Sequence, residues 1–241
     1  MNTELAHGGD PAFASVNLIS IVLPVYNQAD HIEDVVTNLE AALRHVRCRH
    51  EFILVSNACR DQSPAICKKL AQSSAHVRAV DIAEGGWGRA VKVGLREAKG
   101  TVVGYANSAR TTPDQLATLI LQALVNPGSV VKATRVGRSG VRMVGSSLYN
   151  WESRLLFRFV SSDVNGTPKF FPRTFHKLLE LSYDDDLIDL EFMRICHSEG
   201  YPVLEVPIFS GKRHGGESTT RFRTALKLYS GAYRMWRGKK E

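Results

Sequence analysis

The sequence lacks several features that would assign it to a common class of protein. None of its hydrophobic runs reaches the ~18–20 apolar residues that a membrane-spanning helix needs. The segment Met1–Val16 lacks a basic stretch followed by a hydrophobic one, so we expect a flexible N-terminal tail rather than a signal peptide. The four cysteines show neither CxxC spacing nor a zinc-binding arrangement with histidine, which favours free thiols in a reducing cytoplasm.

The composition that remains is that of a globular protein with an excess of positive charge. The chain has 241 residues, 44% hydrophobic and 23% charged, which suits one large folded domain. Its net charge of +7 favours anionic partners such as phosphorylated ligands, an acidic membrane surface or nucleic acid. No repeat and no low-complexity linker divides the chain, so we expect a single domain.

Short apolar runs alternate with helical patterns along the chain. The runs that predict strands are Leu18–Val25, Phe52–Val55, Val77–Ile82, Thr101–Tyr105, Val130–Ala133, Lys169–Phe171 and Val203–Pro207. The segments whose apolar spacing predicts helices are Asp30–Leu43, Ser63–Leu70, Trp87–Ala98, Thr112–Leu124, Ser147–Phe159 and Leu187–Glu199. This alternation predicts an α/β fold with a mostly parallel central sheet flanked by helices. Ligands of such sheets bind beyond the carboxyl ends of the strands.

The first strand ends in the segment Val22–Asn27, with the sequence VLPVYN. This segment resembles the opening of family 2 glycosyltransferases with the GT-A fold, and further motifs extend the resemblance from about Leu18 to Arg223. The chain is similar in particular to dolichyl- and polyprenyl-phosphate sugar transferases. The resemblance implies a GT-A catalytic domain over residues 17–220 and inverting transfer of a sugar from a nucleoside diphosphate sugar. It also implies a polyprenyl or other lipid phosphate as acceptor.

The resemblance places the donor nucleotide at the turns that follow the first three strands. An amide in the Ser56–Asp61 turn offers both a donor and an acceptor to a base edge, although the family usually has a carboxylate there. The glycine-rich segment Glu84–Ala90 would let the backbone approach a diphosphate at the start of the next helix. The residues that it assigns to the donor are Pro24, Tyr26, Asn27, Asn57, Gly86 and Arg89. Ordinary strand-to-helix turns are the alternative reading of these segments.

The chain departs from the family at the metal site. Ala106, Asn107 and Ser108 stand where the family has the Asp-x-Asp that binds Mg²⁺ or Mn²⁺. Three interpretations are open. A metal could be held by substrate phosphates and the neutral oxygens of Asn107 and Ser108, the cations Arg110 and Arg89 could replace it, or catalysis could be lost. An arginine within this loop favours metal independence.

Two later segments contain the residues that the resemblance assigns to the acceptor. A basic glycine-rich stretch, residues 135–145, resembles the part of polyprenyl-phosphate transferases that grips the lipid phosphate. The segment Asp163–Arg173, DVNGTPKFFPR, resembles a motif of bacterial members. The residues expected to contact the acceptor are Arg135, Arg142, Ser146, Asp163, Asn165 and Lys169. A solvated basic surface is the alternative for the first segment.

Charged groups near the end of the chain complete the predicted site. Asp189, at the entry to a helix, is the candidate general base if the acceptor is a hydroxyl, whereas a phosphate acceptor needs no base. Arg213 and His214 lie in a segment that resembles the family's R-x-x-G-E-S loop, so with Arg110 we expect them to stabilise charge on the leaving diphosphate. Helix capping and surface charge are the alternative at Asp189.

The last 21 residues predict a basic amphipathic helix over residues 221–241. They combine aromatic and aliphatic side chains with seven basic residues: Arg221, Arg223, Lys227, Arg234, Arg237, Lys239 and Lys240. Such a helix suits the surface of an anionic membrane, which predicts a cytoplasmic protein attached peripherally to the inner membrane face. Packing against the catalytic domain is the alternative. We expect no binding to nucleic acid, because no nucleic-acid-binding motif accompanies the positive charge.

Two rival functions remain open from the sequence. The chain could transfer a sugar to a hydroxyl group of a small molecule, with Asp189 as the base. It could also be a catalytically silent protein that binds a sugar nucleotide, for which the missing Asp-x-Asp is the best support.

Overall fold

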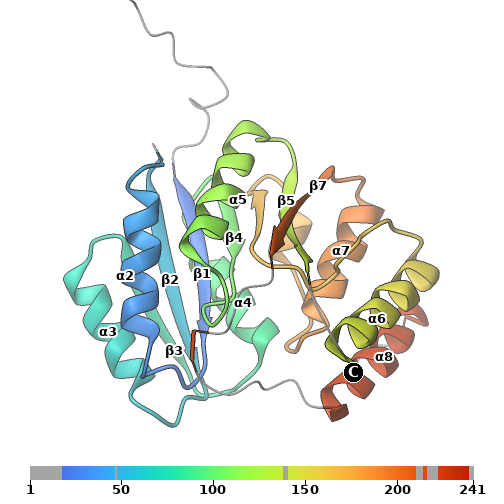
Figure 1. The fold of residues 1–241 in the computed structure, drawn as a ribbon, viewed down its shortest axis with the longest axis horizontal. Coiled ribbons are helices and arrows are strands. Elements are labelled where there is room, and N and C mark those ends of the chain that lie inside the picture. Colours follow the sequence, from blue (N-terminus) through green and yellow to red (C-terminus); the bar gives the residue numbers. More distant parts are fainter. Residues whose placement is uncertain (1–17, 47, 138–140, 210–213, 216–221, 239–241) are drawn as a thin grey trace, which may run out of the picture.

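The computed structural model describes residues 18–46, 48–137, 141–209, 214–215 and 222–238. They form a seven-stranded sheet between two layers of helices (Figure 1). The strands are β1 (Ile19–Val25), β2 (His50–Asn57), β3 (Val77–Ile82), β4 (Val102–Tyr105), β5 (Val130–Val136), β6 (Lys169–Pro172) and β7 (Val203–Phe209). The helices are α2 (Ile32–Leu43), α3 (Ser63–Ser73), α4 (Trp87–Glu97), α5 (Pro113–Val125), α6 (Val141–Phe157), α7 (Ile188–Ser198) and α8 (Phe222–Trp236), with a 3₁₀ turn at His176–Leu179.

The strand order is β3-β2-β1-β4-β6-β5-β7. All neighbouring pairs are parallel except those of β6, which runs antiparallel to both β4 and β5. The carboxyl ends of six strands and the amino end of β6 therefore meet at one edge of the sheet. This edge is the one that the sequence analysis predicts as the ligand site.

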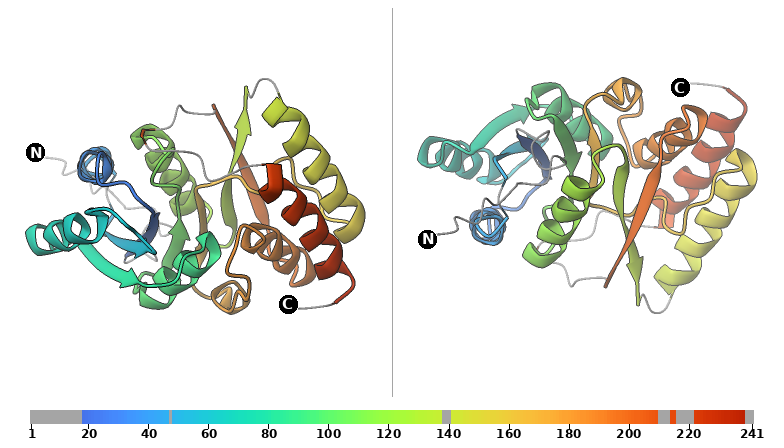
Figure 2. Two further views of the ribbon diagram at one scale, coloured as in Figure 1. Left: turned by 90° about the horizontal axis from the view of Figure 1, so that it is seen from below. Right: turned by 90° about the horizontal axis from the view of Figure 1, so that it is seen from above.

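Two hydrophobic clusters lie on the two faces of the sheet. One joins the sheet to α2, α3 and α5, and the other joins it to α4, α6, α7 and α8. β1 supplies side chains to both clusters, with Ile21 and Leu23 in the first and Val22 in the second, and all three are fully buried. Burial on both faces explains why this strand reads as a nearly continuous apolar run, interrupted only by Ser20. The two views in Figure 2 show the helices on either side of the sheet.

Local sequence signals account for several element boundaries. α5 begins with a capping box, in which the Thr112 hydroxyl accepts from Gln115 N and the Gln115 side chain accepts from Thr112 N. The next residue, Pro113, stands in the first turn, where its missing N–H costs nothing. All seven strands and all six helices predicted within residues 18–209 are present, with shifted ends.

Two predicted boundaries on the acceptor side are wrong. β5 continues past Ala133 to Val136 because it pairs in register with β7, so Arg135 lies on a strand and not in a loop. α6 begins at Val141, six residues before the predicted Ser147, and takes in much of the stretch read as a glycine-rich loop. Glycine, valine and serine all have low helix propensity, so single-residue preferences do not predict this early start.

Among the described residues, no helix is both long and apolar enough to cross a bilayer. The four cysteines are unpaired, as predicted.

Candidate donor and acceptor site

The turn after β1 is tied to its neighbours by amide side chains. Asn57 donates from Nδ2 to the Val25 carbonyl at 2.8 Å, and its Oδ1 accepts from Gly86 N at 3.2 Å. Asn57 is 5% exposed, so its amide joins the ends of β1 and β2 to the glycine-rich turn. Asn27 has a positive φ of 48° and accepts from Arg60 N through Oδ1 at 2.8 Å. Tyr26, at 40% exposed, presents an open aromatic ring at this edge.

The glycine-rich turn serves a packing purpose. A Cβ at Gly86 would lie 2.4 Å from the Asp184 carbonyl oxygen, and one at Gly88 would lie 2.4 Å from the Tyr183 carbonyl oxygen. Both glycines therefore admit the backbone of the Tyr183–Asp185 segment, where the sequence analysis expects a diphosphate. Only residues without a Cβ allow this approach.

Arg89 also faces this segment. Its Nη2 contacts Asp184 Oδ2 at 2.7 Å, and its backbone N–H donates to the Asp184 carbonyl at 3.0 Å. Lys92 contacts the other carboxylate oxygen at 2.7 Å. Hydrogen bonds from Lys92 and Arg89 hold the pKa of Asp184 below its ordinary value. Arg89 is thus an ion-pair partner of Asp184 in this structure, which differs from the predicted contact with an open phosphate site.

The loop after β4 contains the residues that the resemblance matches to the family's metal-binding Asp-x-Asp. Ala106 belongs to the hydrophobic core and is fully buried. The Ser108 hydroxyl, 1% exposed, donates to the Pro24 carbonyl at 2.6 Å. Asn107 Oδ1 accepts from Ala109 N at 3.0 Å. The two neutral oxygens named as weak metal ligands are therefore engaged within the protein.

These residues do not fit a divalent cation. Mg²⁺ and Mn²⁺ prefer carboxylate oxygens, and the described part of the chain contains no group of three or more His, Cys, Asp or Glu side chains that could hold a metal.

His214 contacts the same loop. Its backbone N–H donates to the Ala109 carbonyl at 2.9 Å, and its ring Nε2 lies 3.0 Å from the Thr111 carbonyl. A carbonyl oxygen only accepts, so Nε2 carries the proton in this contact. His214 thus holds the loop in place, together with Gly215, which packs against His31. Arg110 is half-buried in this loop, whereas Arg213 lies outside the described residues.

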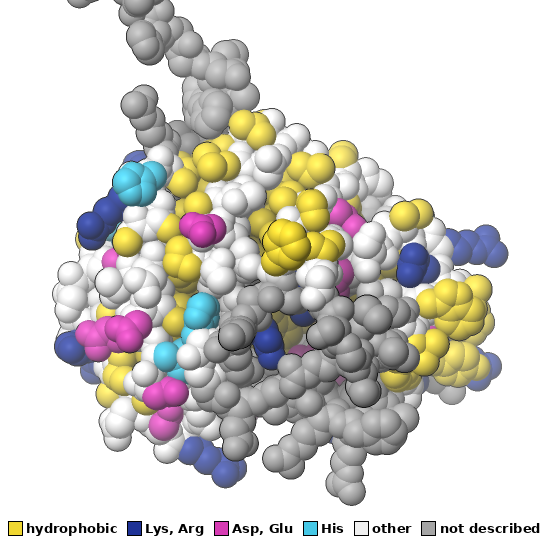
Figure 3. All heavy atoms as spheres, in the orientation of Figure 1, with side chains coloured by type: hydrophobic (Ala, Val, Ile, Leu, Met, Phe, Trp, Pro, Cys, Tyr) yellow, Lys and Arg dark blue, Asp and Glu magenta, His cyan; other side chains and the backbone are white. Residues whose placement is uncertain are grey.

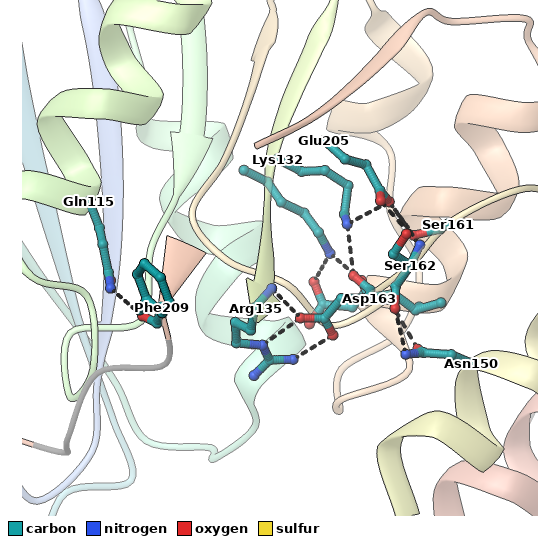
Figure 4. Close-up of polar contacts among 12 residues, drawn as sticks. Gln115, Lys132, Arg135, Asn150, Ser161, Ser162, Asp163, Glu205 and Phe209 are labelled. Carbon is teal, nitrogen blue, oxygen red and sulfur yellow. Dashed lines mark hydrogen bonds and ion pairs between the residues drawn. The ribbon is translucent and has the colours of Figure 1, made fainter. Parts of the chain in front are cut away.

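On the acceptor side, Arg135 and Asp163 form a two-pronged ion pair (Figure 4). Arg135 Nε contacts Oδ2 at 2.7 Å and Nη2 contacts Oδ1 at 2.8 Å, while Arg135 N donates to Oδ2 at 3.1 Å. Asp163 is 3% exposed, but about a quarter of the Arg135 side chain reaches solvent. The structure therefore brings together two of the predicted acceptor residues. The side chains of Arg142 and Ser146 lie outside the described part of α6.

A row of polar side chains crosses the sheet behind this pair. The register places Tyr105 of β4 beside Lys169 of β6, Lys169 beside Lys132 of β5, and Lys132 beside Glu205 of β7. Lys132 and Lys169 are fully buried. The Lys132 ammonium donates to the Asp163 carbonyl at 2.7 Å and contacts Glu205 Oε1 at 3.1 Å.

Each buried charge in the row is compensated. Lys169 donates to the Val164 carbonyl at 3.0 Å and pairs with the Asp189 carboxylate. Burial lowers the pKa of Lys132, since the protein interior solvates the charged ammonium less well than water does. Partial burial opposes ionisation of Glu205, but Lys132, the Ser161 hydroxyl and the Ser162 amide hold its pKa at about 2.

Asp189 is not placed as an accessible base. The residue is 4% exposed, and its Oδ1 accepts from the Tyr105 hydroxyl at 2.7 Å as well as from Lys169. This corrects the expectation that Asp189 faces a hydroxyl acceptor. Asn165, in contrast, has an amide oxygen that is buried without a hydrogen-bond partner in the described structure.

Comparison with known proteins decides the family of this site. The family model described as glycosyl transferase family 2 matches residues 20–188. This chain belongs to glycosyl transferase family 2. Its seven-stranded α/β fold is the GT-A fold that the sequence predicts.

Among curated relatives of this family 2 chain are two enzymes called undecaprenyl-phosphate 4-deoxy-4-formamido-L-arabinose transferase. The one from Pseudomonas savastanoi pv. phaseolicola is 29% identical over 145 residues, covering 58% of this chain and 41% of the relative. The one from Pseudomonas fluorescens is 25% identical over 209 residues, covering 84% of this chain and 60% of the relative. The chain therefore spans less than two thirds of the length of these relatives.

Solved structures add the fold alone. Glucosyl-3-phosphoglycerate synthase from Mycobacterium tuberculosis, in complex with Mn²⁺, uridine diphosphate and phosphoglyceric acid, superposes with a TM-score of 0.74 at 15% identity. The match covers 96% of this chain and 82% of that one.

Sequence reasoning missed several residues of this family 2 site. The sequence did not indicate a role for Tyr105, Glu205 or Ser161, because each lies in a segment that reads as strand or turn. The available signal was a lysine within one apolar run, VVKAT, and a lysine at the start of another, KFFP, since an unpaired buried charge is costly and demands partners. Asp186 was also missed, and burial followed by repulsion from Asp189 and Asp185 raises its pKa to about 6.

Proposed function

We propose that this protein transfers a sugar from a nucleoside diphosphate sugar to a lipid phosphate, with inversion at the anomeric carbon. Membership of family 2 supports the reaction class. Relatives whose names specify undecaprenyl phosphate support the acceptor, and a structural neighbour in complex with uridine diphosphate supports a nucleotide-sugar donor.

The observation that carries the choice of acceptor is the pairing of Asp189. A hydroxyl acceptor needs a general base, and the candidate base is committed to Lys169 and Tyr105. A phosphate acceptor is already an anion and needs none. It needs instead a cation at the sheet edge, and Arg135 is partly open there. A guanidinium carries five N–H donors, so one that gives two of them to Asp163 can still donate to a phosphate oxygen.

In this mechanism the donor lies over the turns after β1 and β2, where Tyr26 and the ordered Asn27 turn contact the nucleoside. An oxygen of the acceptor phosphate attacks the anomeric carbon, and the bond to the nucleoside diphosphate breaks with its electron pair on the leaving group. Arg110 and Arg213 balance the charge of that diphosphate, while His214 holds the loop that carries Arg110. No step uses a metal, because the loop after β4 does not fit one.

Acceptor binding uses Arg135 with Arg142 and Ser146, and the unpartnered amide oxygen of Asn165 accepts from a donor-sugar hydroxyl. Lys169 acts indirectly, since it is buried and orients Asp189. A lipid acceptor implies a cytoplasmic protein that works at the inner face of an anionic membrane, with the C-terminal helix at its surface.

The test is a transfer assay with a panel of UDP-, GDP- and dTDP-sugars and undecaprenyl phosphate, with products identified by mass spectrometry. Arg135→Ala should lower kcat/KM by about a hundredfold, since a charge-assisted contact to the acceptor phosphate is lost. Arg96→Ala, an exposed arginine on α4, is the matched control and should leave transfer unchanged. Donor binding without transfer to any acceptor would instead support a silent sugar-nucleotide-binding protein.

One observation favours a hydroxyl acceptor as second candidate. The raised pKa of Asp186, about 6, is suited to a base at neutral pH. Transfer to a small-molecule hydroxyl that disappears in Asp186→Asn, with a pH limb near 6, would decide for this alternative.

A further inference from the structure

α6 exposes a stripe of apolar side chains that no part of the described chain covers. Leu148, Trp151 and Leu155 are 53%, 58% and 63% exposed, and their spacing puts them on one helix face. Val160, just beyond the helix, is 94% exposed. A helix of a globular domain normally turns its apolar face to the core, but here the core-facing side chains include Asn150.

α8 widens this surface. It packs beside α6, where the rings of Tyr149 and Tyr229 meet edge to face with centroids 5.8 Å apart. Figures 1 and 2 show the two helices side by side at the end of the molecule away from α2 and α3. α8 buries Met235 but leaves Tyr233 and Trp236 47% and 51% exposed. In Figure 3 hydrophobic side chains gather on the right-hand edge of the molecule, where Figure 1 draws these helices, with basic side chains beside them.

The charges around the stripe have one sign. Among the described side chains of α6, α8 and the residue after each, every exposed charged group is basic: Arg154, Arg158, Lys227 and Arg237. The one acid of these helices, Glu152, is half-buried, and burial raises its pKa. Aromatic rings next to basic groups suit the interface of an anionic bilayer, where rings sit among the headgroups and cations meet lipid phosphates.

We propose that the exposed faces of α6 and α8, the α6–α8 surface, dock this protein on an anionic lipid bilayer, with Leu148, Trp151 and Leu155 as the apolar anchor. A second copy of the chain fits this surface less well. A twofold interface brings a patch against itself, so the four basic groups would face one another without an exposed acid to pair with them. A bilayer instead supplies negative headgroups around an apolar interior.

The inference extends the proposed function, because a lipid phosphate is reached only at a bilayer, but it rests on the surface and not on catalysis. It also moves the main anchor from the C-terminal helix to α6, which the sequence analysis did not assign to a membrane.

The experiment is flotation of the full chain with phosphatidylcholine vesicles that contain or lack phosphatidylglycerol, without donor or acceptor. The wild-type chain should float only with the anionic vesicles. Trp151→Glu/Leu155→Glu should abolish flotation. Arg154→Gln/Arg158→Gln should lower the partition coefficient at least about tenfold at low salt and less at high salt.

The matched control is Leu121→Glu, an apolar residue of α5 that is 46% exposed outside the α6–α8 surface, and it should float like the wild type. Circular dichroism and donor calorimetry establish that each variant is folded with an intact donor site. Equal flotation of the wild type and the Trp151→Glu/Leu155→Glu variant would overturn the proposal. A wild-type dimer that this variant dissociates, without vesicle binding, would overturn it in favour of a second copy.

The failure of one proposal can be told from that of the other. A chain that floats but transfers no sugar leaves the docking surface standing and removes the proposed reaction. A chain that transfers sugar to detergent-dispersed lipid phosphate but never floats leaves the proposed reaction standing and removes the docking surface.

Discussion

The two halves of the site edge are built by different kinds of interaction. On the donor side, apart from the partly exposed ion pairs of Asp184 with Arg89 and Lys92, hydrogen bonds to backbone carbonyls hold the turns. The Asn57 amide, the Ser108 hydroxyl and the His214 ring make these bonds. On the acceptor side, buried ions hold one another, with Lys132 and Lys169 between Glu205 and Asp189. A neutral scaffold tolerates partial loss, because each hydrogen bond contributes only about 0.5–1.5 kcal/mol. A buried ionic row does not, because removing one member leaves an uncompensated charge.

The sharpest test of this comparison removes a lysine from the row. Lys169→Met should lower the free energy of unfolding by about 3–5 kcal/mol, because it leaves the Asp189 carboxylate buried without its cation. Urea unfolding measures the change. Lys177→Met is the control: Lys177 pairs with Glu180 at 3.7 Å on the surface, and its loss should cost under about 0.5 kcal/mol. Equal effects of the two variants would refute the contrast between the halves.

A second test probes close packing on the donor side. Gly88→Ala places a Cβ 2.4 Å from the Tyr183 carbonyl, against backbone that has no room to withdraw. We expect a loss of about 1–3 kcal/mol in unfolding free energy, together with weaker donor binding. Gly128→Ala, which meets nothing within 4 Å, should be neutral or slightly stabilising. If Gly88→Ala keeps full stability yet loses donor affinity, the glycine serves a ligand and not the Tyr183–Asp185 segment.

A third test uses pH. Asp186 has a folded-state pKa of about 6, above the ordinary 3.8, so the folded chain binds its proton more tightly than the unfolded chain. Its stabilising contribution is complete below the ordinary value and is lost as pH rises to about 6. Asp186→Asn should therefore stabilise the chain by about 3 kcal/mol at pH 7 and hardly at all at pH 3.5.

Glu205 works in the opposite direction. Its pKa is lowered to about 2 from 4.5, so its contribution is present above 4.5 and declines as pH falls toward 2. Urea unfolding of the wild type, Asp186→Asn and Glu205→Gln across this pH range separates the two. An Asp186→Asn effect that is the same at pH 3.5 and pH 7 would mean that packing, and not the proton, accounts for it.

Elements marked by one strong local signal could be predicted from the residues alone. β1, β3 and α5 follow from apolar runs and from the Thr112–Pro113 start. The acceptor half could not be predicted in the same way, because its structure depends on partners that are distant in the chain. Arg135 was predicted to lie in a loop because the residues around it do not indicate the pairing of β5 with β7. The burial of Asp189 depends on Lys169, which lies 20 residues away in the chain. Alternating patterns report which side of an element is buried, but not which charge will meet which.

The smallest expected effect is that of metal removal, and it tests the donor half directly. We expect the donor dissociation constant, measured by calorimetry, to change by less than about twofold between Mg²⁺ and EDTA, because a neutral loop gives a divalent ion little to bind. Glucosyl-3-phosphoglycerate synthase offers a control of the same fold, since its complexes include Mn²⁺ and Mg²⁺. Donor binding that appears only with Mg²⁺ would contradict the expectation. It would mean that Ser108 leaves the Pro24 carbonyl when the donor arrives, and that the neutral scaffold of the donor half is rebuilt around a cation supplied with the substrate.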